Sequence, residues 1–237
     1  GSVCGFIGAL AAVLMVEYNW HFVPATLVCL LCGGLIGAIQ GGFVAFSRIP
    51  SFIVTLGGLT LWRGLAFDAT GGFDNSGMPD PLPFIGYGQL LGVPMPIWIT
   101  GVFFVVMAFV LSSTKLGRYV YAMGSNEMGA RQVGINIRWY KLGVYVISGL
   151  SCALGAIVLM ARMDSSSGKM AQMFELDAIA AVILGGTSLF GGRGSIWGKP
   201  VGRRADHHDP QRHEPDGNFP VQTNDGHWCR GHCGGLD

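Results

Sequence analysis

The composition of this 237-residue chain indicates a membrane protein. Half of its residues are hydrophobic and 12% are charged, whereas soluble globular chains carry about a quarter charged residues. The net charge is +1 and no basic patch stands out, which excludes a nucleic-acid-binding protein. The first 200 residues hold 19 charged residues, and the last 37 are far more polar. We therefore expect a membrane domain over residues 1–199 and a polar, disordered tail over residues 200–237.

Six apolar segments follow one another along the first 199 residues. A helix needs about 20 apolar residues to cross a hydrocarbon core of about 30 Å. Some of the six are shorter, so they extend into their flanks or re-enter from one side. They predict an all-α fold, a polytopic membrane helix bundle with an irregular C-terminal tail. The six segments are residues 3–16, 26–46, 51–67, 97–111, 142–160 and 176–190.

The charges between these segments predict how the chain is oriented across the membrane. Residues 113–141 carry five Lys and Arg against Glu127 alone, so we place this stretch in the cytoplasm. Residues 68–96 carry three Asp and no Lys or Arg, which places them outside. Strict alternation of the segments then puts residues 163–175 outside.

Glycine is unusually frequent, and some of it is regularly spaced. Gly33, Gly37 and Gly41 recur every four residues and so share one helix face. Small residues let membrane helices approach closely, and this approach holds a bundle together in lipid. We expect a helix contact along this face, whereas residues 97–111 lack such a ladder and should face lipid.

A nine-residue pattern occurs twice. Residues 56–64 (LGGLTLWRG) and 184–192 (LGGTSLFGG) share L-G-G-x-x-L-aromatic-x-G. The topology above runs the first copy outward and the second inward. Inverted repeats with glycine-interrupted segments are common in transporters and mark the substrate path. The pattern predicts a glycine-broken inverted repeat, with chance similarity in a glycine-rich chain as the alternative.

Motifs for catalysis are absent from the sequence. Gly198-Lys199 is followed by Pro200, so it does not form a phosphate-binding P-loop. Glu175 and Asp177 are a carboxylate pair that is able to act as acid and base. Acidic residues at the positive end of a helix are the plainer interpretation. We expect no enzyme activity, no catalytic residue, no cofactor and no metal.

Three stretches of the chain have long and specific sequences: residues 49–58 (IPSFIVTLGG), 116–136 (LGRYVYAMGSNEMGARQVGIN) and 175–189 (ELDAIAAVILGGTSL). Together they closely resemble the ribose, xylose and arabinose permeases of bacterial ABC importers. The resemblance to this branched-chain amino acid and monosaccharide permease family covers residues 1–198. Gly1-Ser2 is similar to the end of the family's D-L-S-x-G-S motif, which implies that the first membrane segments are missing.

The resemblance implies a multi-pass subunit of the bacterial inner membrane that translocates a ribose-like monosaccharide. It implies three partners: a second permease copy, a cytoplasmic ATP-binding subunit and a periplasmic sugar-binding protein. In such importers a short cytoplasmic helix docks into the ATPase, and residues 125–134 resemble it. An ordinary solvated helix is the alternative. The candidate coupling residues are Ser125, Asn126, Glu127, Arg131 and Gly134.

Candidate residues of the substrate path lie near the paired glycines. Hydroxyl groups there are able to bond a sugar, and a phenylalanine is able to stack on it. Polar residues in membrane segments equally well form helix-to-helix hydrogen bonds. The candidates are Ser51, Phe52, Thr55, Gly57, Gly58, Gly185, Gly186 and Thr187.

The polar tail allows two interpretations. Closely spaced His227, Cys229, His232 and Cys233 are able to bind zinc. Alternatively, the tail is read in the wrong frame. When each codon is read from its second base, the tail becomes apolar and resembles the family's final membrane segments, and Trp228 before Cys229 must give glycine. We favour a one-base frameshift between about residues 197 and 204.

Two other functions stay open at this stage. One is a stand-alone secondary transporter or channel built on the same inverted repeat. The other is a non-functional remnant of the permease, which follows from the truncation and the frameshift. Dependence of uptake on an ATPase distinguishes the importer from a secondary transporter or channel. Restored uptake in a permease-deleted strain excludes a non-functional remnant.

Overall fold

The computed structural model describes residues 1–47, 49–187 and 191, together with 221–222 and 228–229. By its contacts the chain divides into two units, Gly1–Lys199 and Pro200–Asp237, and each is taken by itself. The described residues of the second unit are two short strands that pair antiparallel, β5 (Val221–Gln222) and β6 (Trp228–Cys229). The rest of the expected polar tail, with its zinc and frameshift interpretations, lies outside the described residues.

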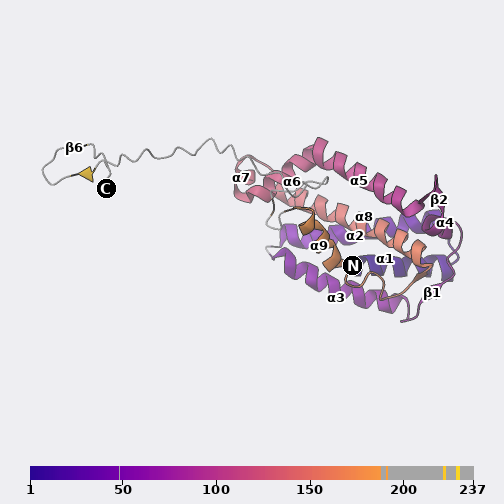
Figure 1. The fold of residues 1–237 in the computed structure, drawn as a ribbon. Coiled ribbons are helices and arrows are strands. Elements are labelled where there is room, and N and C mark those ends of the chain that lie inside the picture. The colour runs from indigo at the N-terminus through magenta and orange to yellow at the C-terminus, as the bar shows by residue number, and fades with distance from the viewer. Residues whose placement is uncertain (48, 188–190, 192–220, 223–227, 230–237) are drawn as a thin grey trace, which may run out of the picture. The chain divides into compact units, whose positions relative to one another are not determined.

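The first unit is a bundle of helices (Figure 1). Two short antiparallel strand pairs, β1–β4 and β2–β3, lie among them. The strands are β1 (Asn75–Ser76), β2 (Gln89–Leu90), β3 (Val93–Pro94) and β4 (Ser165–Ser166). The helices are α1 (Ser2–Ala12), the π-helical η1 (Val13–Glu17), α2 (Phe22–Phe46), α3 (Ser51–Ala69), α4 (Leu82–Tyr87), α5 (Met95–Ser113), α6 (Lys115–Ser125), α7 (Glu127–Gln132), α8 (Ile137–Met163) and α9 (Phe174–Leu184).

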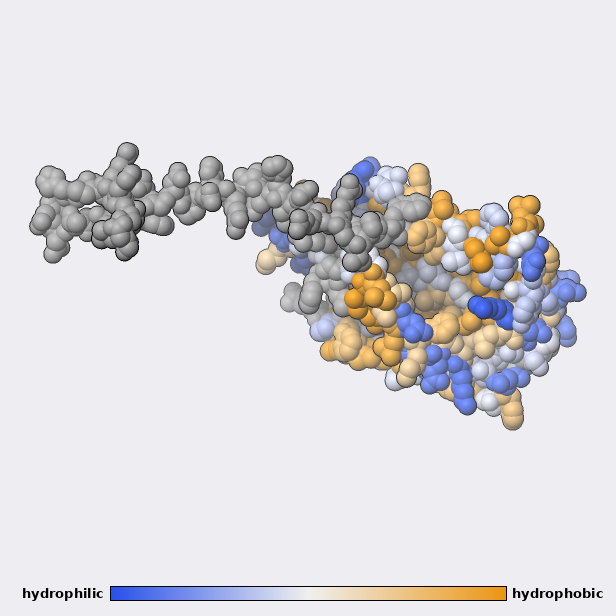
Figure 2. Space-filling model, viewed as in Figure 1, coloured by the Kyte–Doolittle hydropathy of each residue, from blue (hydrophilic) through white to orange (hydrophobic). Residues whose placement is uncertain are grey.

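Four of these helices, α2, α3, α5 and α8, are long and apolar enough to cross a membrane. They coincide with four of the six predicted segments, and the all-α membrane bundle is confirmed. The first predicted segment is a shorter apolar helix, Ser2–Glu17. Of the sixth, the structure describes residues 176–187, and within them the 11-residue α9 ends before Gly185. Apolar residues cover much of the visible face of this unit (Figure 2).

The glycine ladder of α2 lies against α8, as its spacing predicts. Gly33 and Gly37 contact Gly149, and a methyl group added at Gly149 would meet the main chain of Gly33. A methyl group at Gly41 would lie 2.6 Å from the β-carbon of Tyr145. The two helices therefore touch backbone to backbone, which is the geometry that small residues permit in lipid. By contrast, Ala108 is the only buried residue of α5.

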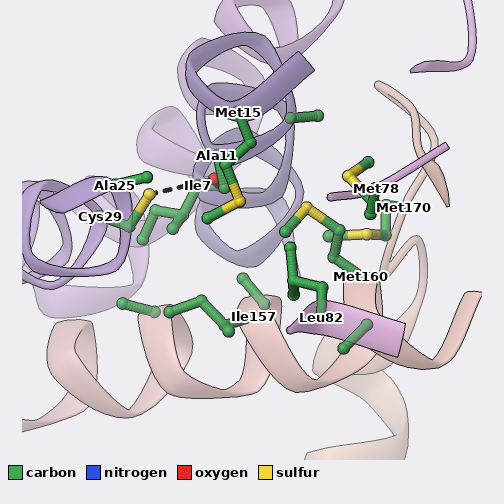
Figure 3. Close-up of a cluster of buried hydrophobic side chains, with 14 of the residues drawn as sticks. Ile7, Ala11, Met15, Ala25, Cys29, Met78, Leu82, Ile157, Met160 and Met170 are labelled. Carbon is green, nitrogen blue, oxygen red and sulfur yellow. Dashed lines mark hydrogen bonds between the residues drawn. The ribbon is translucent and has the colours of Figure 1, made fainter. Parts of the chain in front are cut away.

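A cluster of buried apolar side chains fills the space between α1, α2, α4 and α8 (Figure 3). Ile7, Met15, Leu82 and Met160 are almost completely buried. The flexible side chain of methionine fills irregular gaps between helices of different direction. The Cys29 thiol donates a weak hydrogen bond to the Ile7 carbonyl at 4.0 Å.

The two stretches assigned to the outside meet at one end of the bundle. Asn75 pairs with Ser166 and Ser76 with Ser165 in the β1–β4 ladder. The Met78 amide donates to the Asp164 carboxylate at 3.3 Å. Because both stretches take part in one small sheet, they lie on the same side, as the charge pattern predicts.

The stretch after β4 is not the simple outer loop that the sequence predicts. It folds back along α1, so that Ser166 and Met170 lie beside Gly8, and Glu175 lies 3.5 Å from the Gly1 amino group. A 16-residue helix is about 24 Å long, so Glu175 lies far from the outer end of α1. Counting charges locates loops but does not show that part of residues 163–175 packs along α1. The placement of this stretch on the outer side stays a prediction.

The contact between α2 and α8 gives a matched test on one helix. Gly149→Ala places a methyl group against the Gly33 main chain, whereas Gly155 has open space around its α-carbon. We expect Gly149→Ala to destabilise the bundle by about 1–3 kcal/mol through overpacking. Gly155→Ala should be neutral or slightly stabilising, because alanine has the higher helix propensity. Thermal unfolding in detergent measures both, and equal midpoints would contradict this view of the contact.

Candidate functional site at the inner end of the bundle

The stretch assigned to the cytoplasm folds into two short helices between α5 and α8. The Thr114 hydroxyl accepts from the Gly117 amide at the start of α6. The Asn126 side chain accepts from the Gly129 amide at 2.9 Å and so caps α7. Gly134 then takes a φ of +83°, a conformation that glycine adopts without strain. These local signals fix where α7 begins and where the chain turns towards α8.

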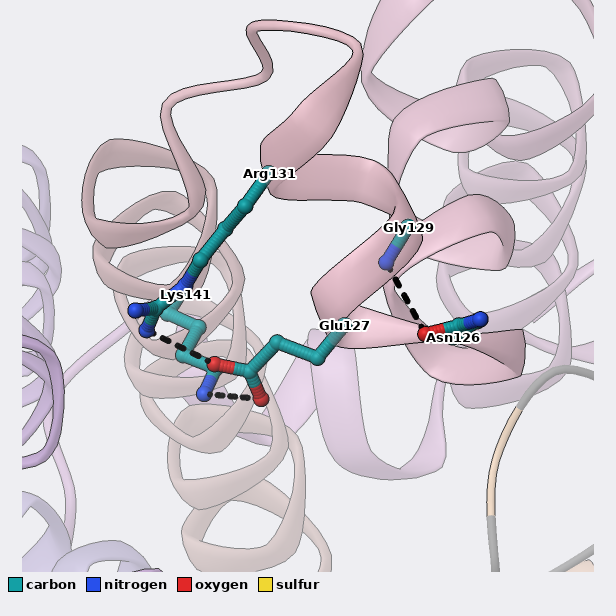
Figure 4. A network of polar contacts seen from close by, with 5 residues as sticks. All are labelled: Asn126, Glu127, Gly129, Arg131 and Lys141. Carbon is teal, nitrogen blue, oxygen red and sulfur yellow. Dashed lines mark hydrogen bonds and ion pairs between the residues drawn. The ribbon is translucent and has the colours of Figure 1, made fainter.

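Glu127 joins α7 to α8 (Figure 4). One of its carboxylate oxygens accepts from Arg131, one turn along α7, at 3.2 Å. The other accepts from Lys141 of α8 at 2.9 Å. The hydrogen bond from Lys141, and then that from Arg131, hold the pKa of Glu127 below its usual range, although partial burial opposes them. A charged carboxylate therefore links two helices that are separate in the sequence.

The predicted coupling residues lie together on and around α7, but most of their polar groups are bonded within the chain. Besides the Asn126 cap and the Glu127 pairs, the Ser125 hydroxyl donates to the Tyr121 carbonyl at 3.0 Å. Two apolar side chains here are strongly exposed, Met128 at 79% and Val133 at 82%. Sequence reasoning missed both of these, and it missed Lys141, which is 14 residues from Glu127.

Two hollows flank the Glu127–Lys141 pair. One, of about 520 Å³, lies between the end of α2, the start of α3, α7 and α8. The other, of about 480 Å³, lies between α6 and α8 and reaches Gly191. Ser51, a predicted path residue, and Tyr145 line the first hollow. The first hollow thus places charged and polar groups beside apolar residues of α2.

The predicted substrate-path residues fall in two groups that the described structure does not join. Ser51, Phe52, Thr55, Gly57 and Gly58 are on α3, which packs mainly on α1 and, less extensively, on α2. The second group ends α9, where Gly186 has a φ of +76°. In the described part of the chain, α3 has no extensive contact with α9.

The two copies of the repeated pattern also differ in structure. The second ends α9, as a glycine break should. The first does not, because α3 continues without interruption through Gly57 and Gly58 to Ala69. Trp62, four residues after Gly58, packs on Phe6 with ring centroids 5.3 Å apart. The predicted break at Gly57-Gly58 is therefore wrong, and the packing of the rest of α3 on α1 accounts for the continued helix.

Arg63 is a charged residue inside a membrane-length helix that the motifs did not single out. Its guanidinium donates to the Gly168 carbonyl at 3.0 Å and to the Met170 carbonyl at 2.9 Å. Both carbonyls belong to the segment that folds back along α1. Unpaired backbone groups are costly in lipid, so Arg63 holds this segment by satisfying two of them. Among the described residues no cluster of His, Cys, Asp and Glu is arranged to hold a metal.

Comparisons with known proteins agree in one family. A family model described as "Branched-chain amino acid transport system / permease component" matches residues 2–202. The chain is 39% identical over 208 residues to the ribose import permease protein of Haemophilus influenzae, covering 85% of this chain and 64% of the relative. Against the ribose import permease protein of Escherichia coli K12 it is 42% identical over 207 residues, with the same coverage.

A more distant relative is the autoinducer 2 import system permease protein of Shigella flexneri. It is 35% identical over 202 residues, covering 85% of this chain and 59% of the relative. The chain therefore spans less than two thirds of the length of these relatives. No solved structure matches it.

The Glu127 network predicts how α7 responds to pH. A carboxyl whose pKa is lowered by folding stabilises the folded state above its unfolded pKa of about 4.3. That contribution is lost as the pH falls through the lower, folded pKa. We expect hydrogen exchange of the α7 amides, corrected for intrinsic rates, to be constant from neutral pH downward and to rise only below about 4.

The matched variants are Glu127→Gln and, as control, Asp68→Asn at the opposite end of the bundle. Glu127→Gln should weaken α7 protection at neutral pH and remove the pH dependence, because the amide keeps the shape but loses the charge. Asp68→Asn should leave α7 unchanged. Wild-type exchange of α7 in Glu127→Gln at neutral pH would show that the network does not hold the helix.

Proposed function

The chain belongs to the branched-chain amino acid transport system / permease component family, and on this premise we propose that it is the membrane-spanning subunit of an ATP-driven importer. In this proposal it carries a monosaccharide inward across the bacterial inner membrane. A separate cytoplasmic ATP-binding subunit supplies the energy, a periplasmic sugar-binding protein delivers the sugar, and a second permease copy completes the pathway. The observation that carries the proposal is α7, a short capped helix with an apolar exposed surface at the inner end.

The exposed surface of α7 suits contact with another protein. Met128 and Val133 offer apolar area, and apolar and aromatic side chains dominate the energy of most interfaces. The Asn126 cap and the Glu127–Arg131 pair hold the helix rigid, so less ordering entropy is lost on docking. The role of Asn126, Glu127 and Arg131 is then to position the surface, while Met128 and Val133 make the contact.

The Glu127–Lys141 bond gives a route from this surface into the membrane. A displacement of α7 is transmitted to α8 through the Glu127–Lys141 ion pair at 2.9 Å. The contact between Gly33 and Gly149 then carries it to α2. We propose that closure of the ATP-binding subunit moves α2 and α8 together.

The identity of the cargo rests on the relatives. The similar proteins of Haemophilus influenzae and Escherichia coli are named for ribose import, and a further relative of Escherichia coli is named for xylose transport. Within the proposed path, Ser51 lines the inner hollow, and Phe52, the next residue along α3, is 70% exposed. The Thr55 hydroxyl bonds the carbonyls of Ser51 and Phe52 in its own helix, so it contributes less to sugar binding. The exposed faces of α3 and α9 leave room for a second copy.

Docking on α7 is tested by introducing a charge on its apolar surface. Met128→Asp should abolish co-purification of this chain with the ATP-binding subunit of the same bacterium, because a carboxylate would be buried at the interface. Leu91→Asp makes the same kind of change at a residue that is 87% exposed in the outer stretch. This control should still co-purify. Equal co-purification of both variants would contradict docking on α7.

Uptake distinguishes the importer from a stand-alone secondary transporter. Labelled ribose is measured in a strain that lacks its own permease and expresses this chain with its binding protein and ATP-binding subunit. An importer loses uptake when the ATP-binding subunit is inactivated, whereas a secondary transporter continues on an ion gradient. Absence of uptake under all conditions favours the remnant.

We also propose that residues after about 204 are encoded out of frame. The family match ends at residue 202, close to Trp197, after which the apolar pattern of the sequence stops. The nucleotide sequence of this region tests the proposal directly. We expect the frame shifted by one base to be open and to encode apolar segments, and stop codons or polar residues there would refute it. In that case, one tightly bound zinc per purified chain would support the metal interpretation.

A further inference from the structure

We propose that the hollow of about 520 Å³ at the inner end is a binding site for the phosphate headgroup of an anionic phospholipid from the cytoplasmic leaflet. The hollow is formed by the C-terminal end of α2, by Ile49 and Pro50 before α3, and by the facing parts of α7 and α8. The proposal does not require the ATP-binding subunit, and Ser51, a residue of the proposed sugar path, lines the same hollow.

The charge of the hollow favours an anion. Its lining carries three cationic side chains, Arg131, Arg138 and Lys141, against the single carboxylate of Glu127. Glu127 is shared between Arg131 and Lys141. Within the described part of the chain, Arg138 forms no ion pair, and its guanidinium carbon lies 6.0 Å from the ring centre of Phe46. Arginine presents several donors in a fixed plane, which suits the oxygens of a phosphate.

The surroundings of the hollow favour a lipid over a free phosphate ion. Val44, Ala45 and Pro50 form an apolar part of its wall. Phe46 and Ile49 are 53% and 44% exposed. A ligand with a charged head and an apolar tail contacts both the cationic and the apolar residues of this wall, whereas inorganic phosphate binds only to the cationic ones.

The level at which the hollow lies in the membrane also fits a headgroup. Trp139 is 62% exposed and meets Phe46 edge to face at 6.2 Å between ring centres. Aromatic residues gather at the level of lipid headgroups, and positive residues gather on the cytoplasmic side. Basic pockets between membrane helices on that side are suited to anionic headgroups. The volume is within the range of small-molecule sites, about 300–1,000 Å³.

The test uses the full chain in bilayers that mix phosphatidylcholine with phosphatidylglycerol, followed by detergent extraction and native mass spectrometry. Arg138→Gln removes a cation from the hollow. Arg118→Gln removes the same charge from exposed α6, outside the hollow, and is the matched control. We expect retained phosphatidylglycerol to fall about fivefold in Arg138→Gln, because one basic residue near an anionic surface contributes about 1 kcal/mol.

Arg118→Gln should retain the lipid like the wild type, and Arg138→Lys should recover part of the loss. The proposal is overturned if both glutamine variants retain phosphatidylglycerol equally, or if phosphatidylcholine is retained as well as phosphatidylglycerol. Complete displacement of the lipid by excess inorganic phosphate would show that the hollow binds phosphate without selecting a lipid, and would overturn the proposal of a phospholipid ligand. Thermal unfolding of each variant separates loss of the site from loss of the fold.

Discussion

The backbone contact between α2 and α8 is the interaction on which the rest of the first unit depends. Helices in lipid gain no hydrophobic energy from meeting, so they associate by close packing. Gly33, Gly37 and Gly149 provide that packing. At its inner end α8 carries Lys141, which positions α7. At its outer end α8 carries Met160, which belongs to the buried apolar cluster. The contact of α8 with α2 therefore positions both the inner ion pair and the outer cluster.

The contact also explains why the inner polar network is ordered. A surface ion pair usually contributes little, because two long side chains lose entropy and salt screens their charges. Glu127 and Lys141 differ from such a pair, since each belongs to a helix whose position is already set. α7 is fixed by the Asn126 cap and the turn at Gly134, and α8 is fixed by α2. The Glu127–Lys141 ion pair therefore joins two helices whose positions are already fixed. Arg138 lies next to this pair in the wall of the inner hollow.

Much of the fold follows from the sequence, because the relevant signals are local or periodic. Length and apolar content predict α2, α3, α5 and α8, and the four-residue glycine spacing predicts the face of α2 that meets α8. Charge counts predict which stretches share a side. The contacts of Arg63 with Gly168 and Met170, and of Glu127 with Lys141, were not predictable, because they join positions that share no spacing. The repeated glycine pattern was misleading at Gly57-Gly58, since the packing of Trp62 on Phe6 keeps α3 helical there.

Arg63 has a consequence for how the returning segment is able to move. Its guanidinium donates to two carbonyls, three and five residues beyond Ser165. Where these groups are shielded from water, an N–H group that leaves one carbonyl has no replacement until another acceptor is in reach. Displacement of this segment therefore raises the energy from its first ångström. We therefore expect the segment to prefer positions along α1 in which both carbonyls keep a donor, and a gradual slide between them to be unfavourable.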